Sequence, residues 1–226
     1  MSTVVFQNTG ESLPVGKILC LGRNYAAHAA EMAGDIPDSP IVFLKPATAV
    51  VHHGDSVILP PISRDVHHEV EMVVVMGRKA RHVRIEDAYD FVEGYAVGLD
   101  MTLRDVQKEA RKKGDPWTVA KGFDTSAPLS PAVPKTDIPN PHALDISLTV
   151  NGQLRQSSNT SKMIFTIDYL ISYLTGIMTL EPGDLIFTGT PEGVGPVHHG
   201  DTLEAELEGV GKLRVGVLSE PLRASA

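Results

Sequence analysis

The chain has 226 residues, of which 42% are hydrophobic and 21% charged, which suits a globular protein with a sizeable core. Its formal net charge of -8 argues against nucleic acid or an anionic membrane as the main partner, although a bound metal could still attract an anionic metabolite. The single cysteine, Cys20, excludes an intrachain disulfide. No basic leader with an apolar core begins the chain, and no apolar stretch approaches the ~20 residues that span a bilayer. We therefore expect a cytoplasmic protein.

The first element that could carry chemistry is a short helix, expected after a buried strand at 17–21. Its alanine-rich segment begins at Asn24, a suitable N-cap, and would stop at Gly34. His28 and Glu31 lie three positions apart on this helix and can touch. Because a loop with two prolines follows, the helix could move as a lid over a site. The alternative is a surface helix with an incidental His–Glu pair, and the spacing alone favours it.

The stretch 67–77 joins two acids to a β-branched apolar run that ends in glycine, which predicts a buried strand. Because side chains alternate along a strand, Glu69 and Glu71 would face the same side, roughly 6–7 Å apart at Cα. Carboxylates held this close repel each other, and they suit Mg²⁺, Mn²⁺ or Ca²⁺ as ligands. The alternative is a strand that starts at the surface, with both acids solvated or paired to arginine. Alternation also places His67 on this face, but an all-oxygen site does not need it as a ligand.

The next long strand, expected at 95–100, delivers a third acid, Asp100, at its carboxyl end. The charged segment 101–113 permits a helix, and a Gly-Asp-Pro-Trp sequence separates that segment from Lys121. This lysine could simply extend to solvent. It could equally be the electrostatic counterpart of a nearby group of acids, and the local sequence does not decide between the two.

The second half of the chain is β-rich. An alternating segment at 144–150 followed by Asn-Gly predicts a hairpin, and apolar residues at helical spacing predict a helix within 164–179. The glycine-rich loop 189–195 lacks the lysine and the spacing of a P-loop, which argues against nucleotide binding. That loop could instead place the Thr190 hydroxyl and backbone amides against an anion.

Paired histidines occur twice, within the matching pentapeptides Val-His-His-Gly-Asp at 51–55 and 197–201. Such pairs could bind a transition metal. Gly-Asp is also common turn chemistry at the start of a strand. We therefore prefer the interpretation that these are exposed turn histidines.

Several short motifs follow one another along the chain in a recognisable order. They are Gly22-Arg23-Asn24-Tyr25, Phe43-Leu44-Lys45-Pro46, Glu69-Val70-Glu71, Leu99-Asp100-Met101-Thr102, Asp105-Val106-Gln107, Pro116-Trp117-Thr118 and the loop that begins Gly189-Thr190-Pro191. Together these motifs resemble the fumarylacetoacetate hydrolase superfamily, and in particular its small acylpyruvase-like branch. The resemblance runs from about residue 17 to residue 217, which is nearly the whole chain.

The resemblance implies an α+β fold, a mixed β-sandwich or β-roll of the fumarylacetoacetate hydrolase C-terminal-domain type, with short helices and a lid helix. Residues 1–16 would form a lead-in and residues 17–226 a single catalytic domain, usually paired as a homodimer. It further implies that Glu69, Glu71 and Asp100 hold Mg²⁺ or Mn²⁺.

The resemblance also implies a metal-dependent hydrolase that acts on a small 2-oxo acid. It would cleave the C–C bond of acylpyruvates, such as acetylpyruvate or fumarylpyruvate, through a pyruvate enolate, with oxaloacetate decarboxylation as a second activity. His28, oriented by Glu31, would take a proton from water, and Lys121 would stabilise the enolate. The residues expected to hold the substrate are Arg23, Gln107 and Thr190.

Two other classes of function remain open. An isomerase, tautomerase or decarboxylase of 2-oxo acids in aromatic catabolism would use the same carboxylates and lysine, because these reactions also pass through an enolate. A non-catalytic, metal-stabilised binding module would gain stability from metal but turn over no 2-oxo acid. The His28 and Glu31 pair argues against the binding module, since a purely structural metal site does not require it.

Overall fold

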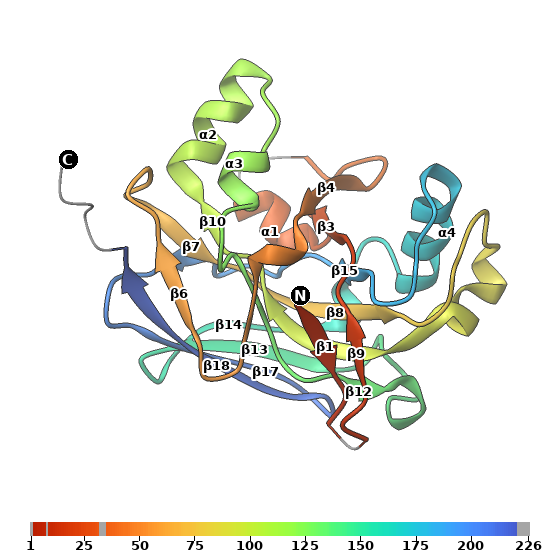
Figure 1. The fold of residues 1–226 in the computed structure, drawn as a ribbon. Helices are drawn as coiled ribbons and strands as arrows, with labels where there is room; N and C mark the ends of the chain where they lie inside the picture. The colour runs from red at the N-terminus through yellow and green to blue at the C-terminus, as the bar shows by residue number, and fades with distance from the viewer. Residues whose placement is uncertain (1, 8, 32–34, 221–226) are drawn as a thin grey trace.

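Two curled β-sheets pack against each other, and most helices gather on one side of them (Figure 1). The computed structural model describes residues 2–7, 9–31 and 35–220. The larger sheet has eight strands, in the order β4 (Ile41–Lys45), β3 (Ile18–Gly22), β15 (Leu185–Phe187), β8 (Val70–Met76), β9 (Val92–Leu99), β11 (Ala127–Leu129) and β5 (Val50–His52), with β12 (Val133–Pro134) beside β9.

The smaller main sheet lies beneath the larger one in Figure 1 and has five strands, in the order β14 (Gln153–Asn159), β13 (Asp145–Val150), β17 (Thr202–Leu207), β18 (Gly211–Ser219) and β6 (Ser56–Leu59). Two minor sheets complete the described part of the chain. One pairs β1 (Thr3–Val5) with β2 (Ser12–Pro14), and the other joins β10 (Thr102–Leu103), β7 (Val66–His68) and β16 (Gly195–Pro196). This mixed α+β architecture is the fold class that the sequence predicted.

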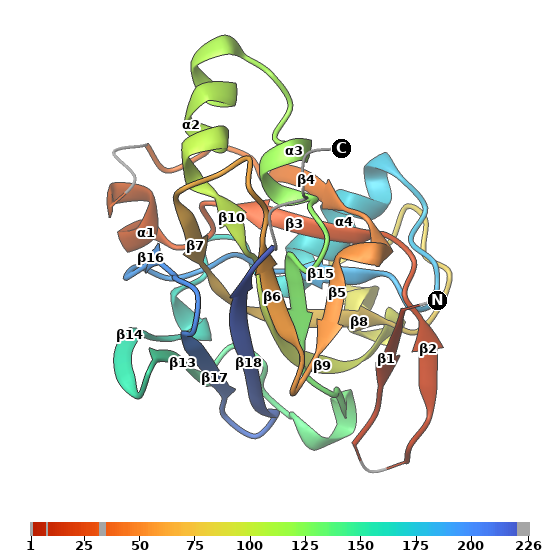
Figure 2. The same cartoon turned by 60° about the vertical axis from the view of Figure 1, so that its left-hand side comes forward.

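The helices are short and flank the sheets. They are α1 (Ala26–Glu31), α2 (Arg104–Lys113), α3 (Thr118–Lys121) and α4 (Ile167–Ile177), with 3-10 turns at Ala47–Ala49, Ile85–Phe91, Lys135–Asp137 and Thr160–Lys162. Helices α1, α2 and α3 lie on the same side of the molecule in both ribbon views (Figures 1 and 2). The expected stop of the first helix at Gly34 lies outside the described residues. In the described ranges, no helix is long and apolar enough to cross a membrane.

Strand β8 is buried along its whole length because it has a hydrophobic core on each face. Met72 and Val74 belong to the core shared with the five-stranded sheet, whereas Val73 and Val75 belong to the core on the opposite face. Each such side chain contributes roughly 1.5–3 kcal/mol when fully buried. Glu71 has the alternation of Val73 and Val75, so its carboxylate points away from the five-stranded sheet.

The single strand expected over 67–77 is instead two strands, and this expectation was wrong. Strand β7 pairs with β10 and β16, whereas β8 pairs with β9 and β15, so the chain changes sheets at Glu69. The carbonyl of Glu69 accepts a hydrogen bond from the backbone N–H of Asp100 at 2.8 Å, which fixes the bend beside the end of β9. The bend brings Glu69 and Asp100 together, which simple alternation along one strand could not predict.

Candidate metal centre and active site

Three buried carboxylates meet where β8 and β9 run antiparallel. Glu69 precedes β8, Glu71 lies within it, and Asp100 follows β9. The pairing of Val70 with Leu99 brings the three positions together, and one carboxylate oxygen from each acid lies within 4.8 Å of the others. In the order of the chain, the three acids are 5%, 1% and 1% exposed, so solvent does little to screen their charges.

Two of the three acids have cationic partners. Lys121 Nζ donates hydrogen bonds to Glu69 Oε2 at 2.8 Å and to Asp100 Oδ2 at 2.6 Å. Arg104 Nη2 donates to Glu69 Oε1 at 2.5 Å. Lys45 Nζ forms an ion pair with Asp100 Oδ1 at 2.8 Å, and it also donates to the carbonyl of Lys121. Glu69 and Asp100 therefore each contact two cations.

The third acid has no such compensation. Glu71 forms no ion pair with any residue that the structure describes, and its Oε2 accepts one hydrogen bond, from the N–H of Gly189 at 2.7 Å. Asp100 Oδ1, despite its ion pair with Lys45, also accepts no hydrogen bond from the described residues. These two carboxylates are thus the ones with unused capacity for a cation.

The pKa values of the cluster reflect this imbalance. Burial would raise the pKa of Glu69, but the charges of Lys121 and Arg104 outweigh it and hold the pKa well below its usual range. For Glu71, burial raises the pKa, and the negative charges of Asp100 and Glu69 raise it further. Burial would lower the pKa of Lys121, but the two acids beside it outweigh burial and raise it. The cluster therefore lacks positive charge at Glu71.

A divalent cation fits this donor set. Carboxylate oxygens are the hard ligands that Mg²⁺ and Mn²⁺ prefer, and a cation would offset the repulsion that raises the pKa of Glu71. Of the surface alternative, only one part is present, because Arg104 pairs with Glu69, whereas both acids are buried and neither is solvated. His67 lies outside the cluster, with its Nε2 2.9 Å from Asp65 Oδ1.

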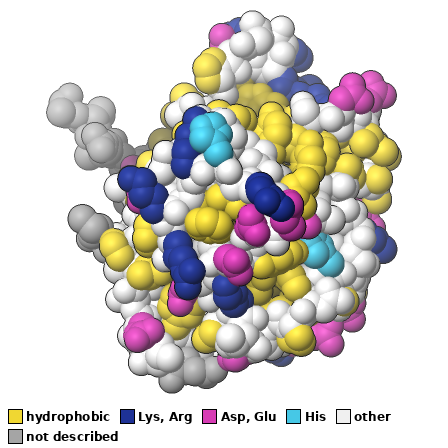
Figure 3. All heavy atoms as spheres, turned by 90° about the vertical axis from the view of Figure 1, so that its right-hand side faces the viewer, with side chains coloured by type: hydrophobic (Ala, Val, Ile, Leu, Met, Phe, Trp, Pro, Cys, Tyr) yellow, Lys and Arg dark blue, Asp and Glu magenta, His cyan; other side chains and the backbone are white. Residues whose placement is uncertain are grey.

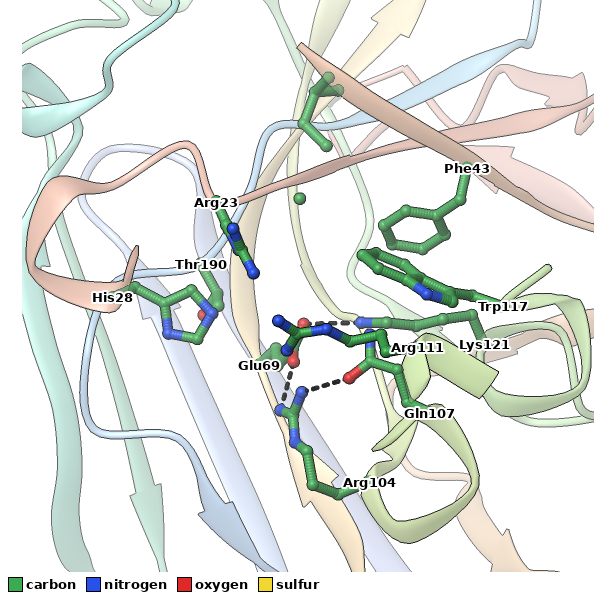
Figure 4. Close-up of a pocket in the computed structure, with 12 residues that line it drawn as sticks. Arg23, His28, Phe43, Glu69, Arg104, Gln107, Arg111, Trp117, Lys121 and Thr190 are labelled. Carbon is green, nitrogen blue, oxygen red and sulfur yellow. Dashed lines mark hydrogen bonds and ion pairs between the residues drawn. The ribbon is translucent and has the colours of Figure 1, made fainter. Parts of the chain in front are cut away.

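A pocket opens beside the carboxylates (Figure 4). His28 and Thr190 lie on one side of the pocket, and Lys121 and Trp117 lie on the other. The guanidinium groups that point into the space between them belong to Arg23, Arg104 and Arg111. The side wall of this polar pocket also contains Phe43, whose ring centroid is 4.9 Å from Lys121 Nζ.

The guanidinium groups of two of the arginines have no partner among the described residues. Arg104 is held by Glu69 and by the side-chain oxygen of Gln107 at 2.8 Å, whereas the guanidinium groups of Arg23 and Arg111 form no hydrogen bond or ion pair with another described residue. Arg23 also has a positive φ of 59°, a conformation that costs of order 1–3 kcal/mol in a non-glycine residue and often occurs at functional sites. The pocket therefore presents two uncompensated positive charges to a ligand.

The helix α1 carries His28 to the edge of the pocket. Its Nδ1 lies 3.2 Å from Glu31 Oε2, and the carboxylate of Glu31 also accepts the backbone N–H of Gly193 at 3.1 Å. The pair thus connects α1 to the glycine-rich loop. With Nδ1 directed at Glu31, the His28 ring leaves Nε2 for a ligand, which is the arrangement of an oriented general base.

All nine residues predicted from the sequence lie in or next to this one pocket, although their roles stay predictions. Six of them line it, Glu71 and Asp100 complete the carboxylate cluster, and Glu31 supports His28. The six lining residues are Arg23, His28, Glu69, Gln107, Lys121 and Thr190.

Sequence reasoning missed four side chains of the site. Lys45 closes an apolar strand directly before a proline, and such a buried charge could have been expected to need an acid. Arg104 and Arg111 are seven positions apart, so they share a face of α2. Gln156 gave no local signal, because its partners His68 and Thr190 are 88 and 34 positions away in the chain.

The chain is similar to known proteins over most of its length. A family model described as fumarylacetoacetate (FAA) hydrolase C-terminal matches residues 17–218. The mitochondrial oxaloacetate tautomerase FAHD1 of Bos taurus is 54% identical over 193 residues, which are 85% of this chain and 87% of the bovine protein.

Solved structures give the same result. The crystal structure of fumarylpyruvate hydrolase from Pseudomonas aeruginosa in complex with Mn²⁺ and pyruvate matches with a TM-score of 0.93 at 40% identity, covering 96% of each chain. That of 5-carboxymethyl-2-hydroxymuconate delta-isomerase from Mycobacterium smegmatis matches with a TM-score of 0.83 at 41% identity, covering 94% of this chain and 87% of the isomerase. The chain therefore belongs to the fumarylacetoacetate hydrolase family.

Proposed function

We propose that the protein is a Mg²⁺- or Mn²⁺-dependent enzyme that forms the enolate of a 2-oxo acid, and that it chiefly interconverts the keto and enol forms of oxaloacetate. The observation that carries this proposal is that Glu71, which pairs with no cation among the described residues, belongs to the carboxylate cluster beside the pocket that His28 and Lys121 line. The mammalian FAHD1 relatives, which are 52–54% identical and named oxaloacetate tautomerase, support the choice of substrate. A divalent metal on the three carboxylates would polarise the 2-oxo group.

His28 acts as the base in this proposal. Its imidazole, oriented by Glu31, takes a proton from C3 of the keto form and returns one to C3 in the reverse direction. Lys121 adds a positive charge near the oxygen on which negative charge develops. The enol forms when that oxygen takes a proton from solvent, so the reaction breaks no C–C bond and needs no water as nucleophile.

Hydrolysis of acylpyruvates is the second candidate, and one observation favours it. The fumarylpyruvate hydrolase of Pseudomonas aeruginosa, at 40% identity over 96% of each chain, was solved with Mn²⁺ and pyruvate. In this reaction His28 takes a proton from water, the resulting hydroxide attacks the distal carbonyl, and the C3–C4 bond breaks. The proton returns to C3, which yields pyruvate and a carboxylic acid. The same residues serve both reactions, and only hydrolysis requires a positioned water.

Arg23 and Arg111, whose guanidinium groups have no partner among the described residues, limit the range of preferred substrates. A 2-oxo acid needs one carboxylate near the metal site, and a second carboxylate would meet Arg23 and Arg111 in the pocket. We therefore expect substrates with two carboxylates, such as oxaloacetate or fumarylpyruvate, to be preferred over acetylpyruvate, which has one. Arg111→Gln should lower kcat/KM roughly 10- to 100-fold for the dicarboxylates and little for acetylpyruvate, because a charge-assisted hydrogen bond is lost. The neighbouring exposed Lys112→Gln is the matched control.

A substrate panel tests the proposal. Purified protein is assayed with Mg²⁺ or Mn²⁺ for loss of the ultraviolet absorbance of oxaloacetate enol, for pyruvate released from fumarylpyruvate and acetylpyruvate, and for decarboxylation of oxaloacetate. Each assay is repeated with a chelator. We expect the fastest metal-dependent reaction to be enol–keto conversion. Full activity in chelator, or no turnover of any 2-oxo acid, would contradict the proposal, and the second result would favour a binding module.

We further propose that the protein is a homodimer. The edge strand β4 borders an apolar hollow lined by Ile41, Phe43, Leu44, Pro116 and Trp117, and Leu44 is 45% exposed. Figure 3 shows hydrophobic side chains gathered at the foot of the projection that α2 forms at the top of the molecule. Sedimentation equilibrium should give twice the monomer mass, and a monomer at all concentrations would contradict this. The cytoplasmic location expected from the sequence stays a prediction, and the FAHD1 relatives are named as mitochondrial.

A further inference from the structure

A buried glutamine connects the five-stranded sheet to the pocket. Gln156, on β14, is 1% exposed and uses all four hydrogen-bonding positions of its amide. Its Oε1 accepts the backbone N–H of Val70 at 3.1 Å and lies 2.9 Å from His68 Nδ1. Its Nε2 donates to Thr190 Oγ1 at 2.8 Å and to the carbonyl of Pro191 at 2.9 Å. Gln156 does not itself line the pocket, and its amide reaches the pocket through Thr190.

Two backbone groups fix the direction of the amide. The N–H of Val70 can only donate a hydrogen bond, and the carbonyl of Pro191 can only accept one. The Gln156 oxygen must therefore face Val70 and its nitrogen must face Pro191, because a reversed amide would leave both buried backbone groups unpaired. It follows that His68 carries its proton on Nδ1, since Gln156 Oε1 has no proton to give.

Gln156 also fixes the direction in which the Thr190 hydroxyl donates its proton. Its hydroxyl oxygen accepts an N–H from Gln156, so the hydroxyl proton cannot point at that nitrogen. No other group in the described part of the chain accepts this proton. Thr190 is 3% exposed and lines the pocket opposite Lys121, so the proton is directed into the ligand space.

We propose that Gln156 is a positioning residue that makes Thr190 an obligatory hydrogen-bond donor and so selects an oxygen acceptor at that end of the ligand. The inference deepens the proposed function and rests on it, since it takes the ligand to be a 2-oxo acid. One carboxylate oxygen and the 2-oxo oxygen face the metal site, and the other carboxylate oxygen accepts from Thr190. An amide in place of that carboxylate presents N–H to a donor and is rejected.

Pyruvate and pyruvamide are the probes, because they differ only in that group. Binding of each to the Mg²⁺-loaded protein is measured by calorimetry for the native chain and for Gln156→Glu. The introduced carboxylate has no N–H, so it takes the hydroxyl proton and turns the lone pairs of Thr190 toward the ligand. We expect pyruvate to bind roughly 10- to 100-fold more weakly and pyruvamide to change little, since a hydrogen bond to a charged group is lost. KM should rise more than kcat falls.

Gln153→Glu is the matched control, because it makes the same change of charge at an exposed position on the same strand. Its preference for pyruvate over pyruvamide should equal that of the native protein. If a folded Gln156→Glu protein, judged by its melting temperature, kept the native preference, the inference would be overturned. A loss of preference in the Gln153→Glu control as well would also overturn it, since the effect would then be one of charge alone.

The Thr190 variants test the inference without changing the buried amide. Thr190→Ser keeps the hydroxyl and should keep the preference for pyruvate, whereas Thr190→Val should lose it; equal behaviour of the two would overturn the inference. In the Thr190→Val background, a change at Gln156 should have no further effect on the preference. These binding tests separate the two proposals. Pyruvate selectivity without turnover would contradict the proposed function alone, and turnover without this selectivity would contradict the inference alone.

Discussion

Ligand-type side chains gather at two kinds of site in the molecule, and the two kinds differ in their surroundings. One is the carboxylate cluster of Glu69, Glu71 and Asp100, which is buried beside a pocket. The other is the pair of His-His-Gly-Asp turns at 52–55 and 198–201, which are largely exposed. Ligand-type residues are present in both, so residue type alone does not distinguish them.

In each turn, the second histidine already has one ring nitrogen bonded to the backbone. His53 Nδ1 accepts the N–H of Arg214 at 3.2 Å, and His199 Nδ1 accepts the N–H of Ser219 at 3.0 Å. The two contacted residues belong to β18, which lies between β6 and β17 (Figure 2). Both turns therefore bond to the backbone of the same strand. The repeated pentapeptide is therefore a structural device, and the preferred interpretation of exposed turn histidines agrees with these contacts.

The acidic cluster shows the opposite situation. Glu71 is buried with no cation among the described residues, and its neighbours Asp100 and Glu69 raise its pKa further. A buried acid without a cationic partner distinguishes a candidate metal site from exposed residues that only have ligand-type atoms.

Replacing the uncompensated acid should abolish function. In Glu71→Gln, metal-dependent turnover should fall by roughly 10³-fold or more. The variant lacks one metal ligand, and the metal would stabilise the transition state by several kcal/mol. His199→Gln removes a ligand-type side chain from a turn and should leave turnover unchanged. Equal losses in the two variants, measured by steady-state kinetics, would remove the distinction between the two places.

Replacing the base should separate chemistry from metal binding. His28→Asn should lower kcat by roughly 10²- to 10⁴-fold, the usual contribution of a general base, while Mn²⁺ affinity stays unchanged. Glu31→Gln should have a smaller effect in the same direction, since that residue orients the ring. The role of His28 would be wrong if the variant kept its turnover, or if it lost metal binding in calorimetry.

Removing metal should lower the stability of the protein, because the stabilising metal would bind at the carboxylate cluster. A cation at 100 times its dissociation constant stabilises the native state by about 2.7 kcal/mol, so a chelator should lower the melting temperature of the native protein. The same chelator should not change the melting temperature of Glu71→Gln. A drop of equal size in the variant would show that the stabilising metal binds elsewhere, and the histidine turns would then be the first place to examine.

The melting temperature of the metal-free protein should depend on pH partly through Glu71. Burial and two neighbouring acids raise its pKa above 4.5 in the native state, so above pH 4.5 the native state holds a proton that the unfolded chain has released. The contribution of Glu71 to stability therefore decreases as pH rises from 4.5 through the raised native pKa. In chelator, the melting temperature of Glu71→Gln should decline less with rising pH than that of the native protein. Parallel curves would contradict the assignment.

A change in one turn should affect stability slightly and function not at all. Asp201 Oδ2 accepts the N–H of His198 at 2.7 Å, and losing such a hydrogen bond costs about 1 kcal/mol. Asp201→Ala removes this acceptor and should therefore lower the free energy of unfolding in urea by about that amount, with normal kcat/KM and metal affinity. A loss of activity without a loss of stability would mean that the turn serves the site.

Much of the site could be predicted because its parts lie at the ends of elements that local patterns define. The run after Glu69 and Glu71 and the strand before Asp100 are apolar enough to be recognised, and His28 and Glu31 follow helical spacing. The change of sheet at Glu69 could not be predicted, because it depends on pairing of β7 with strands distant in the sequence.

The network behind the pocket was also beyond local patterns. Gln156 looks like any polar residue in a hairpin strand, and only the packing of β14 beside the glycine-rich loop gives it partners. The pairing of cations with the acids of the cluster could not be predicted from local patterns either. The residue types show that acids and basic residues are present, but only the fold shows that Lys121 and Arg104 pair with Glu69 and that no cation in the described part of the chain pairs with Glu71.

The most direct test of the account is to locate the metal. Crystals grown or soaked with Mn²⁺ should give an anomalous difference peak enclosed by the carboxylates of Glu69, Glu71 and Asp100, and no peak at either histidine turn. Crystals of Glu71→Gln treated in the same way should lack that peak. A Mn²⁺ peak at 52–55 or 198–201 with none at the carboxylates would contradict the central claim that the buried, uncompensated acid marks the metal site.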